Sequence, residues 1–582
     1  MIAAAPAQPD AAKRRAQQRP NIVQVMTDDQ TVESLRVMPR VRALLSARGV
    51  RFSNHFATYP LCCPSRATWL TGQYAHTHGV RGNAAPSGGY RKIAAGLDNS
   101  LPAWLRGAGY YTGHVGKFLN GYGRGTLPGN DEEVPAGWDE WYGSLDDPDD
   151  YTGGTYTMYG YTLNENGQVV HYGTTPDVED PATYQTDVYS AKAEDFIRRR
   201  APAAKPFYLS VAPLAPHGEA GADGTFTTPG NNPRAAPRHE GALAAEALPQ
   251  PPSFNEEDVS DKPAEIQALR SLTDTAVANI RNRYRSRLES LLAVDEMVQT
   301  LVEALKDTGE LRNTVLIFTS DNGFFHGEHR VPQGKVRVYE PSVRVPLIIR
   351  GPGIPQGRAR PQLTGNIDLA ATILDLADAR PGRQMDGLSL LPLIRDRLLN
   401  PGRALVLEAF FNQGEVADPT QPVNIYRAVR TDRYLYVEYG TGERELYDLE
   451  RDPDQTQSLH LSPGLAQPRA RLAALLGRLR ECAGEVCGSR PSVRLRVRSR
   501  TGPGGCLDSG VRALVLGKQR KQAVSARFYV GARNAGFDGR RPLRRQIGPK
   551  RLSRRHKNRL RVNVTVLDGR VRTISRTVAR RC

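Results

Sequence analysis

The chain has 582 residues, of which 39% are hydrophobic and 24% are charged, a composition typical of soluble globular proteins rather than disordered or fibrous ones. This length exceeds what one hydrophobic core normally serves, so we expect two or three structural units. No apolar run is long enough to cross a bilayer, which argues against a protein with membrane-spanning helices.

The formal net charge of +18 is unevenly distributed along the chain. Residues 488–582 contain 27 Lys and Arg but only 3 Asp and Glu, a net charge of +24. The preceding residues contain 52 Lys and Arg and 58 Asp and Glu, a net charge of −6. A basic block of this kind favours contact with a polyanion. We find no known nucleic-acid-binding module in it, so an acidic polysaccharide or the cell envelope is the preferred partner. The alternative is a small domain with a solvated charged surface.

Residues 1–19 are rich in Ala, Pro, Gln and Arg, and we expect a disordered leader. From 20 to 420, short apolar runs alternate with longer amphipathic segments, which predicts an α/β domain with a mainly parallel sheet. A helix is predicted from about 283 to 307, with Gly309 beyond its end. The Gly- and Pro-rich stretch 219–263 is interpreted as a surface insertion. The predicted strands of this domain are 21–26, 110–115, 206–212, 314–319 and 346–350.

Two smaller units are predicted to follow. Residues 421–481 indicate an antiparallel meander, with strands at 428–430, 434–438 and 445–449, and then a helix at 465–481. Residues 482–582 indicate a basic all-β domain, because 493–497 and 560–567 alternate apolar with polar residues.

Four cysteines lie in this last unit and allow three pairings. We predict the bonds Cys482–Cys487 and Cys506–Cys582, the second of which closes the domain at the chain end. Disulfides imply an oxidising compartment, hence a secreted or cell-envelope protein, although no export signal is visible. Buried reduced thiols are the alternative.

Several predicted strands of the large domain end in polar residues. The carboxyl ends of strands in an open α/β sheet border the ligand site, so these side chains should converge on one cleft. Three carboxylates and one carboxamide suit a hard divalent cation, and the absence of His from that set argues against zinc. The same residues also cap helices and form turns after strands, which is the structural alternative. The residues concerned are Asp28, Asp29, Lys117, His217, Asp321 and Asn322.

The segment Cys62-Cys63-Pro64-Ser65-Arg66, followed by Thr71-Gly72, resembles the sulfatase signature without a mismatch. In that family the first cysteine of the motif is oxidised to formylglycine, and this position is Cys62. Two buried thiols before a helix would explain neither Pro64 nor Arg66. The resemblance extends over about 20–459.

This resemblance implies an alkaline-phosphatase-like sandwich with a large mainly parallel sheet and a small antiparallel C-terminal sheet, the basic β-domain lying outside it. It implies Ca²⁺, with Mg²⁺ as the alternative, bound by Asp28, Asp29, Asp321, Asn322 and the modified Cys62. It further implies that Lys117 and Lys335 bind the sulfate, that His217 contacts the ester and that Arg66 holds the modified residue.

The implied reaction is hydrolysis of a sulfate ester. One hydroxyl of the formylglycine hydrate attacks sulfur, and the second allows the sulfated residue to collapse to the aldehyde. His217 is the leading candidate for protonating the leaving oxygen, with Lys335 or another acid as the alternative. Four further histidines could line the pocket or order loops: His76, His78, His326 and His329.

The segment Gly-Lys-Phe-Leu-Asn, 116–120, departs from the many sulfatases that have a histidine two residues after the lysine. It is closer to N-acetylglucosamine-6-sulfatases and extracellular 6-O-endosulfatases, as are 62–66, 74–80 and 137–141. We interpret 117–120 and 137–141 as pocket-forming loops. A sulfated amino sugar or glycosaminoglycan fragment, with 6-O-sulfated N-acetylglucosamine foremost, is the expected substrate. A formylglycine-generating enzyme is an expected partner. The alternatives are a phosphodiesterase or phosphonate monoester hydrolase of the same superfamily, and an inactive polyanion-binding surface protein.

Overall fold

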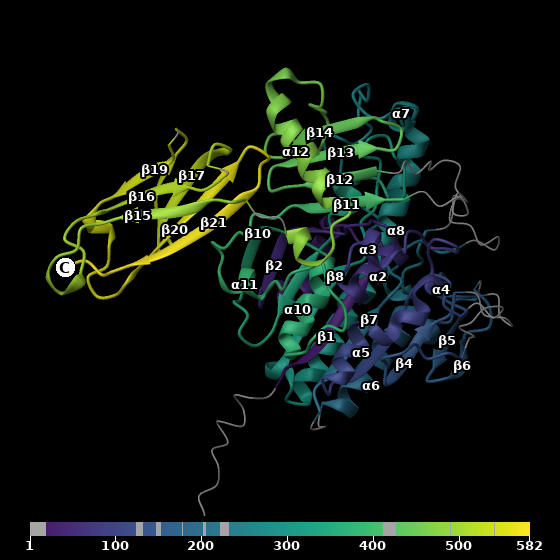
Figure 1. The fold of residues 1–582 in the computed structure, drawn as a ribbon. Helices are drawn as coiled ribbons and strands as arrows, with labels where there is room; N and C mark the ends of the chain where they lie inside the picture. Colours follow the sequence, from purple (N-terminus) through teal and green to yellow (C-terminus); the bar gives the residue numbers. More distant parts are fainter. Residues whose placement is uncertain are drawn as a thin grey trace, which may run out of the picture.

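A computed structural model describes residues 19–123, 132–146, 153–176, 178–201, 205–220, 232–410, 426–488, 491–518, 520–540 and 542–582. Except for Arg19, the predicted leader lies outside the described residues. Figure 1 shows a large body built on a central sheet with helices on both faces, and a β-lobe that projects from one side of the body.

The central sheet has ten described strands in the order β10-β2-β9-β8-β1-β7-β3-β4-β5-β6. The five strands from β8 to β4 run parallel, whereas β9, β5 and β6 are antiparallel to their neighbours. All five predicted strands are confirmed, each start and end within one residue, as β1, β3, β7, β8 and β9. The strands are β1 (Asn21–Thr27), β2 (Val50–Phe56), β3 (Tyr111–Gly116), β4 (Glu140–Ser144), β5 (Tyr161–Glu165), β6 (Gln168–Tyr172), β7 (Phe207–Ala212), β8 (Thr314–Ser320), β9 (Leu347–Arg350) and β10 (Arg358–Gly365).

Helices cover both faces of this sheet, and the alternation of side chains along β1 shows how. Ile22 and Met26 join an apolar core with α2 (Cys62–Thr71), α5 (Leu101–Gly107) and α10 (Ile367–Ala377). Val23 and Val25 join a second core with α6 (Gln185–Arg200) and α8 (Asp274–Asp307). A parallel strand covered on both faces is mainly apolar, which is why these strands could be predicted from the sequence. The predicted α/β sandwich is confirmed.

The predicted helix 283–307 is correct at its end but wrong at its start, because α8 begins at Asp274. The Thr273 side chain accepts a hydrogen bond from the Ala276 amide and caps the helix. Ile280 is the only buried residue in the described stretch between Asp274 and Arg283, so the apolar spacing there is weak. The remaining described α-helices are α3 (Ala75–His78), α4 (Tyr90–Ile93), α7 (Ala264–Gln267), α9 (Glu340–Val343), α11 (Leu391–Arg395) and α12 (Ala466–Leu479). None of the described helices is both long and apolar enough to cross a membrane.

The insertion 219–263 contains little regular structure in its described part, as predicted. It is not confined to the surface, however. Glu256 and Lys262 are buried, and the Lys262 Nζ lies 3.0 Å from Glu256 Oε1. Buried charges of this kind require partners, so this stretch packs as part of the body.

The small antiparallel sheet has four strands, β11 (Leu405–Ala409), β12 (Tyr426–Arg430), β13 (Tyr434–Tyr439) and β14 (Arg444–Asp448). The predicted meander and terminal helix are therefore confirmed, and four leucines of α12 pack against the sheet. The sheet also includes β11, which lies before the expected boundary at 421. This strand was missed because residues 411–425 separate it from β12, and strands of a predicted hairpin are expected to be joined by only a few residues.

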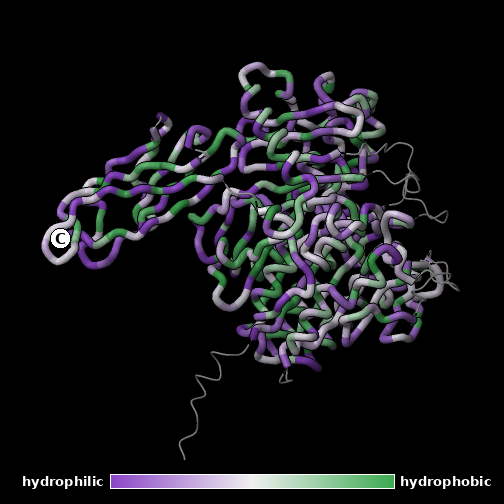
Figure 2. Tube along the Cα trace, in the orientation of Figure 1, coloured by the Kyte–Doolittle hydropathy of each residue, from purple (hydrophilic) through white to green (hydrophobic). Residues whose placement is uncertain are grey.

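The β-lobe consists of two sheets, β15-β16-β19 and β18-β17-β20-β21, whose inner residues form one apolar core. Along its strands hydrophilic and hydrophobic residues alternate (Figure 2), as predicted for a small all-β domain. The Thr573 amide donates to the Asn400 carbonyl at 2.9 Å and joins the lobe to the body. The strands are β15 (Arg494–Arg498), β16 (Val511–Leu516), β17 (Ala523–Val530), β18 (Arg533–Asp538), β19 (Arg544–Ile547), β20 (Asn558–Val566) and β21 (Val571–Val578).

Both predicted disulfides are confirmed, each with a Cα–Cα distance of 5.1 Å. The Cys506–Cys582 bond ties the chain end to the lobe. Cys482 and Cys487 instead lie in the core of the small sheet, so they do not cluster with the lobe as expected. The first disulfide therefore belongs to the body.

Candidate active site

The predicted polar residues meet at the carboxyl edge of the central sheet. Asp28 and Asp29 follow β1, Asp321 follows β8, Lys117 follows β3 and His217 lies beyond β7. The strands β8, β1, β7 and β3 are neighbours in the sheet, which is why residues far apart in the sequence converge.

Helix α2 begins with Cys62 at the same edge. Cys62 is 1% exposed, and its Sγ lies 3.5 Å from Asp28 Oδ1 and 2.8 Å from Lys335 Nζ. The neighbouring Cys63 packs into the apolar core of the sheet. The helix ends at Thr71, and the next residue, Gly72, has a φ of +67° and a position where a Cβ would lie 2.8 Å from the Met385 sulfur. The two adjacent cysteines thus have different environments, and only Cys62 belongs to the site.

Arg66 lies one turn along α2 and binds the residues around Cys62. Its Nε donates to Asp321 Oδ2 at 2.8 Å, and its Nη2 lies 3.3 Å from Asp28 Oδ2. Its Nη1 donates to the Lys117 carbonyl at 2.8 Å. One buried guanidinium therefore fixes two of the predicted metal ligands and the backbone of a predicted sulfate-binding lysine.

Lys117 forms a buried ion pair with Asp28. It follows Gly116, whose φ is +101° and where a Cβ would lie 2.3 Å from the Ala212 carbonyl oxygen, so only glycine fits there. The Lys117 Nζ lies 4.5 Å from the ring centroid of Tyr156. The Asn120 Nδ2 donates to the Tyr156 hydroxyl at 2.5 Å. Tyr156 is thus a site residue that no motif in the sequence indicated.

Lys335 reaches the site from a strained loop. Its Nζ lies 2.5 Å from Asp29 Oδ1. The next residue, Val336, has a φ of +77°, which is unfavourable for a β-branched side chain. Its amide donates to the Pro60 carbonyl at 3.1 Å, and the Tyr426 hydroxyl donates to its carbonyl at 2.7 Å. These two bonds hold the loop in the conformation that aims Lys335 at Cys62.

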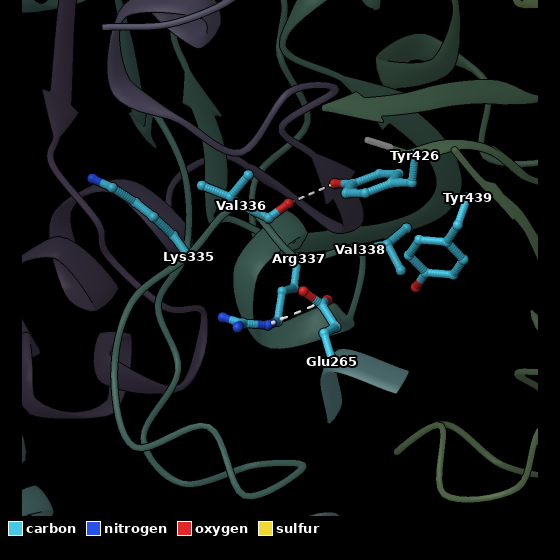
Figure 3. A pocket seen from close by; sticks show the side chains of 7 residues that line it. All are labelled: Glu265, Lys335, Val336, Arg337, Val338, Tyr426 and Tyr439. Carbon is cyan, nitrogen blue, oxygen red and sulfur yellow. Dashed lines mark hydrogen bonds and ion pairs between the residues drawn. The ribbon is translucent and has the colours of Figure 1, made fainter. Parts of the chain in front are cut away.

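Figure 3 shows the small pocket behind this loop, lined by Glu265, Lys335, Val336, Arg337, Val338, Tyr426 and Tyr439. The Lys335 side chain extends away from the two tyrosines, whereas Arg337 turns toward Glu265. Tyr426 belongs to β12, so the small C-terminal sheet supports a residue of the site. No pattern in the sequence indicated this role, because tyrosine is common in strands.

His217 presents one ring nitrogen to the site. Its Nδ1 lies 2.6 Å from the Gly218 carbonyl, which can only accept, so Nδ1 carries a hydrogen. In the neutral ring Nε2 is then an acceptor, and it lies 3.6 Å from Asp29 Oδ2. Burial lowers the pKa of His217 to about 4, outweighing the opposite effect of Asp29 and Asp28. The ring is therefore neutral near pH 7.

The charges of the site balance one another, with Arg66, Lys117 and Lys335 set against three aspartates. Burial alone would raise the pKa of Asp28, but the cations, Lys117 foremost, hold it well below its usual range. Burial raises the pKa of the Cys62 thiol to about 12. An unmodified thiol here would be protonated at neutral pH and a weak nucleophile.

The arrangement fits a metal ion. The ligand atoms of Asp28, Asp29, Cys62 and His217 all lie within 4.8 Å of one another. The Asn322 Nδ2 donates to Asp29 Oδ1, while Asn322 Oδ1 is buried with no hydrogen-bond partner among the described residues. An orphaned buried acceptor beside carboxylates suits a cation. His217 was not expected in this group.

The other singled-out histidines have structural partners. His76 Nδ1 lies 2.8 Å from Glu408 Oε2, and His78 Nε2 lies 3.0 Å from the Thr68 hydroxyl. His329 Nδ1 lies 2.6 Å from a Glu256 oxygen. These three histidines therefore hold loops and the start of the C-terminal region in place.

His326 is buried beside the rings of Tyr284 and Phe324 and is not in the cation group. The segment 137–141 also differs from expectation. Trp138 and Trp141 are buried in the main core, so this motif supports the scaffold and does not form a pocket loop.

Comparison with known proteins agrees with this geometry. A family model described as sulfatase matches residues 20–379, and one described as N-sulphoglucosamine sulphohydrolase, C-terminal, matches 327–482. The chain belongs to the sulfatase family. As a sulfatase, it hydrolyses a sulfate ester.

Among its relatives, human N-acetylglucosamine-6-sulfatase is 34% identical over 505 residues, which cover 81% of this chain and 86% of that protein. An arylsulfatase of Volvox carteri is 36% identical over 516 residues, covering 81% and 76%. The solved structure of BT4656 in complex with its substrate D-glucosamine-2-N,6-O-disulfate matches with a TM-score of 0.64 and 25% identity, covering 79% of this chain and 97% of that one.

Proposed function

We propose that this sulfatase removes a 6-O-sulfate from a glucosamine-type sugar, with 6-O-sulfated N-acetylglucosamine as the foremost substrate. Two similarities support the substrate. One relative is a human N-acetylglucosamine-6-sulfatase, and one similar solved structure holds a glucosamine disulfate. The observation that carries the chemistry is the position of Cys62, at the start of α2 between Asp28 and Lys335.

Cys62 is the precursor of the nucleophile in this proposal, because its thiol is buried and protonated at neutral pH. A formylglycine-generating enzyme would convert it to the aldehyde. In the hydrate, one hydroxyl attacks sulfur as the bond from sulfur to the sugar oxygen breaks, and the second hydroxyl then loses its proton to restore the aldehyde and release sulfate.

Asp28, Asp29, Asp321 and Asn322 would hold the cation together with the modified Cys62. Arg66 fixes Asp28 and Asp321 in place. The oxygen-rich set favours Ca²⁺, with Mg²⁺ as the alternative. When bound, the cation adds positive charge and makes a nearby hydroxyl more acidic.

Lys117 and Lys335 would bind the sulfate oxygens. Burial alone would lower the pKa of each lysine, but the surrounding carboxylates raise both, so both are charged at neutral pH. Fixed charges in a buried cleft stabilise the transition state without reorganisation. Tyr426 acts as a positioning residue for Lys335 through the carbonyl of Val336.

The neutral His217 ring, with Nε2 as an acceptor, is suited to receive a proton from the nucleophile. Protonation of the leaving oxygen falls to Lys335, a charged donor whose Nζ lies 2.8 Å from Cys62 Sγ. This division differs from the expectation that His217 is the donor.

The two disulfides suit a secreted or cell-envelope protein. The basic residues 488–582 would bring the enzyme to an acidic polysaccharide or to the cell envelope.

The test is a turnover screen with defined sulfated sugars, an aryl sulfate and an aryl phosphate. The proposal predicts the highest kcat/KM for a 6-O-sulfated glucosamine derivative. Preference for the aryl sulfate would overturn the substrate, and preference for the phosphate would favour a phosphodiesterase or phosphonate hydrolase. Absence of turnover in protein with modified Cys62 would favour the inactive binding protein.

A further inference from the structure

Strand β15 of the β-lobe carries three arginines on one face. Arg494, Arg496 and Arg498 are exposed, whereas Leu495 is buried in the core of the lobe between them. Because side chains alternate along a strand, the three arginines share the outer face and lie about 6.8 Å apart in sequence order.

The register of the sheet adds two more arginines to this outer face. Arg498 lies directly opposite Arg512 of β16, which is exposed. Arg496 lies opposite Leu514, and Leu514 lies opposite the exposed Arg544 of β19. We call these residues the arginine face: Arg494, Arg496, Arg498, Arg512 and Arg544.

The arginine face has almost no acidic counterpart. Residues 488–582 contain three carboxylates, and Asp568 is paired with Arg570. Asp508 lies 3.5 Å from the Cys582 sulfur. Asp538 is the nearest to the face, because its carboxylate accepts the amide hydrogen of Arg544 at 2.7 Å. Among the described residues, no arginine of the face forms an ion pair with a carboxylate.

Like charges placed directly opposite each other destabilise a sheet, so the Arg498–Arg512 pair does not serve the fold. An external anion would remove that repulsion. Arginine offers a planar fork of donors that matches the oxygens of sulfate, carboxylate or phosphate in pairs. The face therefore has the chemistry of a polyanion-binding surface.

We propose that the arginine face binds a sulfated polysaccharide and holds the enzyme on the polymer that carries its substrate; this partner rests on the proposed function. The outer positions of β15, β16 and β19 bear no aromatic side chain for stacking on nucleic-acid bases. The residues before 488 carry a net charge of −6 and would themselves repel a polyanion. The face supplies the attraction that the catalytic body lacks.

The experiment measures binding of fluorescein-labelled heparin to the full-length protein over a series of salt concentrations. The face variant is Arg494→Gln/Arg496→Gln/Arg498→Gln. The matched control, Arg527→Gln/Arg533→Gln/Arg576→Gln, removes the same charge from exposed positions of the other sheet. Duplex DNA and vesicles of phosphatidylcholine and phosphatidylserine in equal amounts serve as competing partners.

The face variant should bind heparin at least about tenfold more weakly and with a shallower salt dependence, while the control changes affinity less than about threefold. Equal losses of heparin affinity in both variants would mean that the whole lobe attracts heparin through its net charge, and would overturn the proposal that the arginine face is the binding surface. Tighter binding of DNA or vesicles than of heparin would overturn the partner. Heparin binding is measured without turnover, so the binding proposal can be confirmed even if the proposed substrate proves wrong. Unchanged thermal unfolding of both variants excludes misfolding as the cause.

Discussion

The active site and the arginine face both concentrate charge but treat it in opposite ways. In the site, Arg66, Lys117 and Lys335 are almost wholly buried, and each one contacts an aspartate. On the face, five arginines are exposed, and within the described residues none has a carboxylate partner. Burial explains the difference. Burying a neutral polar group without a hydrogen-bond partner costs about 2–7 kcal/mol of folding free energy, and burying an unpaired charge costs at least several kcal/mol.

This difference separates two tasks. Paired buried charges have fixed positions and can stabilise the transition state of one reaction, the cleavage of one ester bond. Exposed unpaired charges attract any polyanion at a distance, and salt screens that attraction over about 8 Å at physiological ionic strength. Changes in the site should therefore act on turnover, and changes on the face should act on polymer binding.

The largest effect is expected at Cys62. Cys62→Ala should abolish sulfatase activity, because it removes the precursor of the nucleophile. Cys63→Ala is the matched control and should keep substantial activity, since Cys63 packs in the core. Turnover of an aryl sulfate measures both. Full activity of Cys62→Ala would refute the mechanism.

Removal of divalent cations should have the next largest effect. Chelation should lower kcat by at least about a hundredfold, because metal-derived charge contributes several kcal/mol to such reactions. Ca²⁺ or Mg²⁺ should restore activity better than Zn²⁺. Asn322→Ala should raise the Ca²⁺ concentration needed for half-maximal activity. A strict zinc requirement would contradict the ligand assignment and favour a set built on His217 and a cysteine thiolate.

Tyr426→Phe tests how the small sheet supports the site. Loss of the bond to the Val336 carbonyl should lower kcat about five- to tenfold, as expected for a hydrogen bond worth about 1 kcal/mol. Adding Val336→Gly should restore part of that loss, because glycine adopts a positive φ without strain. Tyr439→Phe is the control, since its hydroxyl bonds Glu445 in the same region. No effect of Tyr426→Phe, or no rescue, would refute the positioning role.

The pH profile tests the state of His217. With a pKa lowered to about 4, the ring is neutral at higher pH and can accept a proton. The kcat/KM should therefore fall as pH falls through about 4, and this acid limb should change in His217→Gln. A proton donor would give the opposite sign, with activity falling as pH rises above about 4. That result would return His217 to the donor role.

The smallest effect on catalysis is expected from the arginine face. The triple variant at Arg494, Arg496 and Arg498 should keep kcat/KM for a small aryl sulfate within about twofold of wild type, because every residue assigned to the site lies outside the β-lobe. A larger loss on the small substrate would show that the lobe supports the active site and would break the separation of tasks.

Much of the site was readable from the sequence because strand ends and the Cys62 motif are local patterns. The convergence of the proposed ligands after β1 and β8 needed only the rule that parallel strands end at one edge. Tyr156 and Tyr426 were not readable, because their roles depend on contacts between distant segments. The inclusion of His217 among the potential ligands depends on the path of the loop after β7, which no spacing encodes.

The fold was predictable where burial is two-sided. Strand β1 is buried along its whole length and was placed within one residue, whereas the start of α8 has few buried residues. Strand β11 is also fully buried but was missed because residues 411–425 separate it from the rest of the meander. The segment 137–141 shows the reverse error. Its two tryptophans resemble those of particular sulfatases, but they pack in the core and carry no information about the sugar.

The central claim is that Cys62 becomes the nucleophile, and mass spectrometry of the peptide around Cys62 tests it most directly. The account predicts that catalytically active protein contains an aldehyde at Cys62 and an unmodified thiol at Cys63, and that specific activity rises with the fraction converted. A fully active preparation whose Cys62 is entirely an unmodified thiol would contradict the account.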